Sequence, residues 1–146
     1  VHIARALVEN GHATSIRDAF ERFIGAERPF FVPKRPVSPE RAVQTIIRAG
    51  GLAVLAHPGI GGAESVVADL VDVGLAGIEA FHAEHDKDKR EHYVALAKRH
   101  DLLVTGGSDF HGEGTPNPEV GSVDIPGWVL DQLLDAGAAL GWSRSA

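Results

Sequence analysis

The 146-residue sequence contains no cysteine and no methionine. Without cysteine, disulfide bonds and thiolate metal ligands are both excluded. No apolar run approaches the roughly 20 residues that a bilayer-spanning helix needs, and no charged n-region followed by an apolar h-region opens the chain. We therefore expect a cytoplasmic protein with no membrane partner.

Basic residues are also fewer than acidic ones, 14 against 20, which gives a formal charge of −6 at pH 7. An acidic chain is poorly suited to the phosphate backbone of long nucleic acids, so we expect no general nucleic-acid-binding surface. A small phosphorylated substrate held by a local group of cations is compatible with this charge. Hydrophobic residues make up 44% of the chain, as in globular domains with a core, and nothing indicates the oligomeric state.

Two short helices and an extended segment are predicted for residues 1–37. Apolar residues at helical spacing predict a helix over 2–10. A second helix is predicted to begin at Thr14 or Ser15 and to stop at a glycine ten residues later. The prolines in the segment 27–37 exclude a continuous helix there. Because no strand separates the two helices, we interpret this region as a small helical insert.

From Ser38 onward the pattern alternates between helix and strand. Helices are predicted over 38–49, 63–73, 86–100 and 126–140, and strands over 52–56, 77–81, 102–105 and, as one short addition, 121–125. Alternation of this kind is typical of parallel strands joined by right-handed crossovers, and it predicts an α/β fold for residues 38–146.

Polar residues follow each predicted strand at its carboxyl end. They are His57 after the first strand, Glu79 and His82 around the second, and Asp109 and His111 after the third. The carboxyl ends of parallel strands share one edge of the sheet, so we expect these side chains to converge. In an extended segment Asp109 and His111 would point the same way. Oxygen and nitrogen ligands of this kind predict a site for Mn²⁺, Fe²⁺ or Zn²⁺.

The remaining polar residues near these strand ends have alternative interpretations. Glu79 either holds a metal ligand in place, which we favour, or caps the strand end by bonding to backbone. His82 and His85 either face the site or lie in a charged loop, with His85 as a candidate substrate contact. Ser108 is expected to fix its turn rather than to react. The sequence has neither a P-loop nor a Gly-x-Ser-x-Gly elbow, so no catalytic serine is predicted.

Four segments carry a more specific pattern. They are HIAR at 2–5, VPK at 32–34, GGLAVLAHPG at 50–59 and GSDFH at 107–111. In these segments the chain resembles the polymerase and histidinol phosphatase (PHP) superfamily, and most closely its TrpH-like phosphoesterases. The resemblance implies the C-terminal part of a distorted (βα)7 barrel, preceded by a small helical insert.

The resemblance also implies a reaction. PHP phosphoesterases hydrolyse phosphate monoesters through metal-activated water at a centre of two or three divalent ions, and His57, Asp109 and His111 match metal ligands of the family. Mn²⁺ is the expected metal, with Fe²⁺, Zn²⁺ and Mg²⁺ as alternatives. In the TrpH-like branch the substrates are nucleoside 3′,5′-bisphosphates, AMP-like nucleotides or the 5′ ends of short RNAs.

Candidate substrate contacts follow from the same resemblance. His2 and Lys34 fall where the TrpH-like branch has groups near the substrate phosphate. Arg5 shares a helix face with His2 at i,i+3 spacing and is added on that ground. Arg35 is a further cation beside Lys34. The insert from His2 to Lys34 favours the TrpH-like branch over other PHP enzymes.

Several ligands of the family are not found in these 146 residues. The family's His-x-His strand, the Asp and His that follow it, and its metal-bridging Glu would all precede Val1. We therefore interpret the chain as the C-terminal portion of an enzyme and expect it to be inactive alone. Two alternatives stay open: a non-catalytic PHP-like binding or structural module, and a PHP enzyme of another branch such as histidinol phosphatase.

Overall fold

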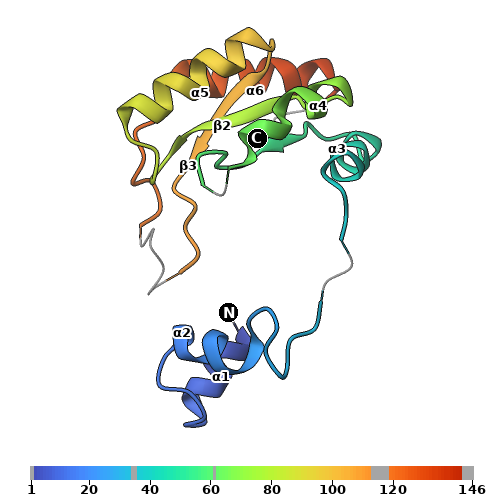
Figure 1. Cartoon of the computed structure of the whole chain (residues 1–146). Helices are drawn as coiled ribbons and strands as arrows, with labels where there is room; N and C mark the ends of the chain where they lie inside the picture. Colours follow the sequence, from blue (N-terminus) through green and yellow to red (C-terminus); the bar gives the residue numbers. More distant parts are fainter. Residues whose placement is uncertain (1, 34–35, 61, 113–118, 143–146) are drawn as a thin grey trace. The chain divides into compact units, whose positions relative to one another are not determined.

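The structure is a computed structural model that describes residues 2–33, 36–60, 62–112 and 119–142. The chain forms two compact units, Val1–Val37 and Ser38–Ala146, and each is described by itself (Figure 1). Within the described ranges, no helix combines the length and the apolar character that crossing a membrane requires.

The first unit consists of short helices around a small core. Helix α1 spans His2–Glu9 and α2 spans Ile16–Ala19, which continues directly into a π-helical turn, η1, at Phe20–Ile24. The second predicted helix therefore exists but widens at its end, where the Gly25 N–H donates to the carbonyl of Phe20, five residues back. The buried residues of this unit are Ala4, Ala13 and Ala19.

The second unit is built on a parallel sheet in the order β1-β2-β3, which confirms the predicted α/β class with parallel strands. Strand β1 spans Val54–Leu55, β2 spans Gly77–His82 and β3 spans Leu103–Gly107. A β-bulge between Glu79 and Phe81 interrupts the pairing of β2 with β3. In the described part of the chain the sheet is open, so the partial (βα)7 barrel that the resemblance implies stays a prediction.

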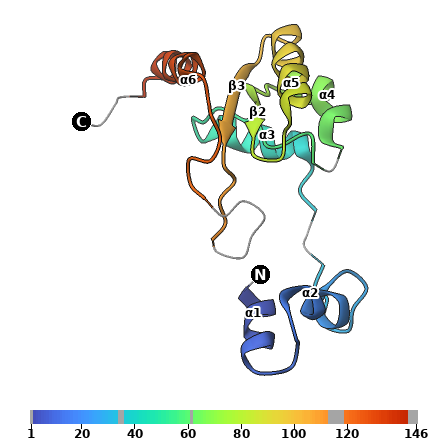
Figure 2. The same cartoon turned by 90° about the vertical axis from the view of Figure 1, so that its left-hand side faces the viewer.

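Helices cover the strands of this unit from two directions. Helix α3 spans Pro39–Arg48, a 3₁₀ turn η2 at Ala63–Val66 leads into α4 at Val67–Asp72, α5 spans Lys87–Arg99 and α6 spans Gly127–Ala139. In Figure 2, α4 and α5 lie together on one side of the strands and α6 lies on the other. The side chain of Gln132 in α6 donates to the carbonyl of Val104 in β3 at 2.7 Å, which fixes α6 beside that strand.

One predicted element is wrong. Residues 121–125 do not pair with any described strand. Gly121 lies in a turn with a φ of 79°, and Pro126 is the N-cap of α6. Between them Val123 is buried, so the apolar residues of this segment anchor a loop and do not belong to a strand. The first strand is shorter than predicted, because only two of its residues pair with β2.

Ile78 in the central strand is fully buried, and we expect Ile78→Val to lower the free energy of unfolding by about 0.5–1.5 kcal/mol. The loss arises because one methylene is removed from a close-packed core. Ile46 in α3 is 40% exposed, and Ile46→Val is the matched control, expected to stay within about 0.5 kcal/mol. Urea denaturation of both variants measures the difference, and equal losses would contradict this placement of the core.

Candidate functional site

The loops that follow the three strands leave from the same edge of the sheet. His82, the last residue of β2, pairs in register with Gly107, the last residue of β3. Strand β1 lies on the other side of β2 and ends at Leu55, two residues before His57. Parallel strands thus bring the three polar loops to one edge, where α/β proteins commonly place their ligand sites.

His57 follows β1 in a conformation that side-chain-bearing residues rarely adopt. Its φ is 29°. Glu79 of β2 holds this turn, because its Oε2 accepts a hydrogen bond from the backbone N–H of His57 over 2.8 Å. The carboxylate of Glu79 therefore fixes the point from which the His57 side chain leaves the backbone. Strained residues held by a specific partner are found most often at functional sites.

His82 and His85 are buried and do not lie in an exposed charged loop. Their exposed fractions are 0% and 1%. Arg90 of α5 braces the turn that carries them, donating from Nε to the carbonyl of His85 at 2.8 Å and from Nη2 to that of His82 at 3.4 Å. The sequence did carry a signal for the burial of His82, because it continues the alternation of the buried residues Ile78 and Ala80 along β2.

Hydrogen bonds determine which ring nitrogen of each buried histidine carries the proton. Nδ1 of His85 lies 2.9 Å from the Ala80 carbonyl, which can only accept, so Nδ1 is protonated and Nε2 carries the lone pair. His82 is the reverse: its Nδ1 accepts from the Glu84 backbone N–H at 3.1 Å, so the neutral ring is protonated at Nε2. Neither Nε2 has a hydrogen-bond partner among the described residues. Such atoms in a protein interior point to a role beyond packing.

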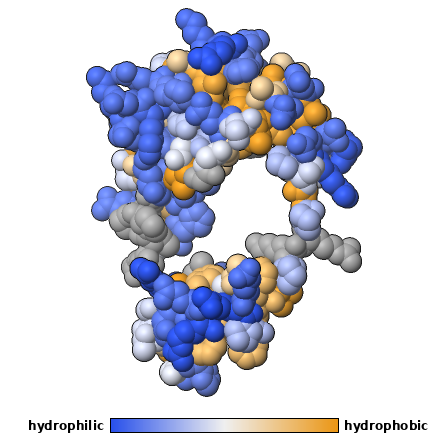
Figure 3. Space-filling view, viewed as in Figure 1, coloured by the Kyte–Doolittle hydropathy of each residue, from blue (hydrophilic) through white to orange (hydrophobic). Residues whose placement is uncertain are grey.

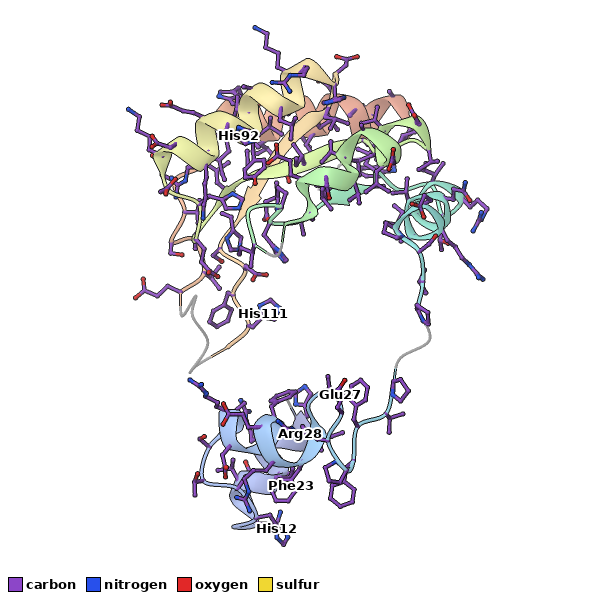
Figure 4. All side chains as sticks on the ribbon, in the orientation of Figure 1. His12, Phe23, Glu27, Arg28, His92 and His111 are labelled. Atoms are coloured by element: carbon purple, nitrogen blue, oxygen red, sulfur yellow. The ribbon has the colours of Figure 1, made fainter. Side chains whose placement is uncertain are left out.

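Tyr93 of α5 packs on the ring of His85, with centroids 5.0 Å apart. Burial raises the pKa of the Tyr93 phenol, and the negative charge of Glu64 raises it further. The phenol therefore stays neutral at physiological pH. The same Glu64 carboxylate lies 2.9 Å from Nε2 of His92, so we assign His92 to this surface pair and not to the strand ends. Figure 4 shows where His92 lies on α5.

Asp109 lies between two histidines. Its Oδ2 is 3.6 Å from Nε2 of His82 and its Oδ1 is 3.5 Å from Nδ1 of His111. The extended geometry expected for this loop is wrong, since Asp109 has a φ of 52°. His111 donates from Nδ1 to the Asp109 carbonyl at 2.7 Å, which leaves its Nε2 as an acceptor, and its side chain extends from the loop after β3 (Figure 4).

The three predicted ligands are connected through His82. The ring of His57 has its centroid 5.5 Å from that of His82, Nε2 of His82 lies 3.6 Å from Asp109, and Asp109 lies 3.5 Å from Nδ1 of His111. Within the described ranges, no three His, Asp or Glu side chains converge closely enough to hold an ion by themselves.

The oxygen and nitrogen atoms of these side chains are nevertheless of the types that bind divalent cations. The carboxylate of Asp109 is one-third exposed, and His111 presents Nε2 while its Nδ1 is tied to a carbonyl, the arrangement that orients metal-binding imidazoles. An ion at this edge would be bound by Asp109 and His111 together with further ligands.

The predicted substrate contacts are distributed over both units. His2 and Arg5 are exposed one turn apart on α1, and Lys34 and Arg35 lie outside the described residues. Ser108 is half-buried directly after β3. His2 borders a hollow of about 650 Å³, and apolar residues show on the surface of this unit in Figure 3. The hollow is lined by His2, Ile3, Phe20, Ile24, Phe30, Phe31 and Val32.

The chain is similar in sequence to known phosphoesterases. It is 36% identical over 131 residues to a 3′,5′-nucleoside bisphosphate phosphatase of Chromobacterium violaceum, which covers 86% of this chain and 46% of that protein. It is 34% identical over 115 residues to the 5′-3′ exoribonuclease Rnm of Escherichia coli, covering 75% of this chain and 39% of that one. No protein-family model matches the sequence.

A solved structure resembles the chain in fold as well. It is a Bifidobacterium adolescentis protein provisionally named a metal-dependent phosphoesterase, with a TM-score of 0.76 and 32% identity, covering 98% of this chain and 50% of that one. The chain thus spans about half the length of the relatives it matches. The similarity is to the class of proteins that hydrolyse phosphate esters.

Proposed function

We propose that the protein is a metal-dependent phosphoesterase of the PHP superfamily, TrpH-like branch, that hydrolyses phosphate monoesters of nucleotides. The observation that carries the proposal is that His57 and Asp109 both lie beside the buried His82, and His111 beside Asp109, at one edge of a parallel sheet. Similarity to a nucleoside bisphosphate phosphatase and to an exoribonuclease supports the substrate class.

In this proposal His57, Asp109 and His111 hold divalent ions. Carboxylate and imidazole ligands suit Mn²⁺, Fe²⁺ or Zn²⁺. The resemblance to PHP phosphoesterases makes Mn²⁺ the first metal to test, with Mg²⁺ as a further alternative. Divalent ions bound there would neutralise phosphoryl oxygens and make a bound water acidic enough to act as nucleophile. Because the described residues do not enclose an ion, the remaining ligands of a centre of two or three ions come from protein outside the described ranges.

The chain's own residues would bind and orient the substrate. His2, Arg5 and Lys34 supply cationic or hydrogen-bonding groups suited to phosphate oxygens, as charge-assisted donors. His85 stays a candidate substrate contact, although it is enclosed beside Gly59 and its Nε2, which carries the lone pair, has no proton to donate to a phosphate oxygen. Nucleoside 3′,5′-bisphosphates, AMP-like nucleotides and 5′ ends of short RNAs are the substrates to test.

Metal removal tests the proposal on the full-length protein. Phosphate release from an adenosine 3′,5′-bisphosphate should cease after dialysis against a chelator and return when Mn²⁺ is added, since the positive charge at the strand ends comes from the ion. Calcium, a larger ion, serves as the control addition. An unchanged rate of phosphate release after dialysis against the chelator would contradict metal dependence.

A second candidate is a non-catalytic binding module of the same fold. The absence of a complete ligand set among the described residues favours it. Nucleotide binding to the full-length protein without any phosphate release, in the presence of each of the four metals, would support this alternative. Faster release from histidinol phosphate than from any nucleotide would instead assign another PHP branch.

A further inference from the structure

We propose that His82 is a positioning residue that holds the carboxylate of Asp109 through an Nε2–H donor. The inference rests on the proposed function, because Asp109 is taken there as a metal ligand, but its geometry is independent of any ion. The protonated Nε2 of His82 is buried, has no hydrogen-bond partner among the described residues and lies 3.6 Å from Oδ2 of Asp109, whereas the protonated Nδ1 of His111, 3.5 Å from Oδ1, already donates to the Asp109 carbonyl.

The orientation of His82 is fixed from its other side. The backbone N–H of Glu84 donates to Nδ1, which leaves the proton of the neutral ring on Nε2. Its ring packs against those of His57 and His85, at centroid distances of 5.5 and 5.3 Å, and it has no exposed surface. The ring is therefore unable to turn its donor elsewhere.

Asp109, by contrast, is free to adjust. Its side chain is 33% exposed, so a small rotation brings Oδ2 within hydrogen-bonding distance of the fixed Nε2–H. That contact satisfies the otherwise unpaired buried nitrogen of His82. The remaining carboxylate oxygen, Oδ1, then has a defined direction and is available to a cation. Groups that orient metal ligands in this way commonly set metal affinity.

Substituting His82 by asparagine or by glutamine distinguishes the role of Nδ1 from that of Nε2. His82→Asn keeps an acceptor near the position of Nδ1 but has nothing at Nε2, whereas His82→Gln places an amide donor near Nε2. Mn²⁺ affinity of the full-length protein should fall about 10-fold or more in His82→Asn and stay within about 3-fold of wild type in His82→Gln. His92→Gln, on the exposed side of α5, is the control and should bind as wild type.

A second measurement needs no metal. In ¹⁵N-histidine-labelled protein, NMR should find His82 as the Nε2–H tautomer, with a slowly exchanging N–H resonance that moves in Asp109→Asn. An Nδ1–H tautomer, a resonance insensitive to Asp109→Asn, or equal Mn²⁺ affinity of His82→Asn and wild type would overturn the proposal, as would equal losses in both His82 variants. Failure of the wild-type protein to bind Mn²⁺ would contradict the proposed function instead, and the NMR result would then decide the role of His82.

Discussion

Asp109→Asn is expected to lower the phosphoesterase activity of the full-length protein more than about 100-fold, because residues that merely orient a metal ligand already cost about 10–100-fold when removed. The substitution keeps the shape of the side chain and removes its negative charge. Asparagine tolerates the φ of 52° at this position as well as aspartate does, so the fold should be retained. Phosphate release measures the loss of activity, and the urea midpoint of the same preparation measures whether the fold is retained.

Asp101 provides a matched control for this experiment. It has a φ of 54°, is exposed, and lies just before β3, at the opposite end of that strand from Asp109. Asp101→Asn changes the same charge in the same backbone conformation without touching the strand-end loops. Its activity should equal that of wild type. Equal activity of Asp109→Asn and Asp101→Asn would remove Asp109 from the site.

Gly106→Ala is expected to destabilise the second unit by about 3 kcal/mol, since overpacking against groups that cannot move costs roughly 1–3 kcal/mol or more. A Cβ at Gly106 would lie 2.5 Å from Cβ of Phe81 and 2.6 Å from the carbonyl oxygen of Phe81. Both contacts are at the β-bulge where β2 and β3 are paired. Relief would require the strands to separate, which would also displace His82 from the loop that carries Asp109.

The neighbouring glycine gives the comparison for this variant. A Cβ at Gly107 would lie 3.5 Å from Oε1 of Glu79 and 4.0 Å from the backbone N of Asp109, and both are ordinary van der Waals contacts. Gly107→Ala should therefore change the free energy of unfolding by less than about 1 kcal/mol. Urea denaturation of the two variants measures the difference, and similar midpoints would show that the bulge at Phe81 does not require glycine opposite it.

Much of the second unit could be predicted from the sequence, because its helices and strands have strong periodic patterns. The capped helix at Pro39–Arg48 and the central strand at Gly77–His82 follow directly from Ser38 and from an apolar run with alternation. The strand predicted over 121–125 was wrong. A short apolar sequence between Gly121 and Pro126 has the same pattern whether it forms a strand or a loop anchored by a buried side chain.

The residues of the candidate site could be selected from the sequence, but their conformations could not. His57 and Asp109 both have positive φ, which local patterns do not indicate for residues other than glycine. The burial of His85 depends on Gly59 from a distant loop and on Tyr93 from the helix that follows, and no periodicity marks it. His2 and Arg5 belong to a separate unit, so their role as phosphate contacts stays a prediction.

Crystals of the full-length protein soaked in Mn²⁺, with anomalous diffraction recorded near the manganese edge, test the central claim most directly. We expect an anomalous peak bonded to the carboxylate of Asp109, with an imidazole nitrogen of His57 or His111 as a further ligand. A manganese peak bound elsewhere, with the Asp109 carboxylate bonded only to protein or water, would contradict the account.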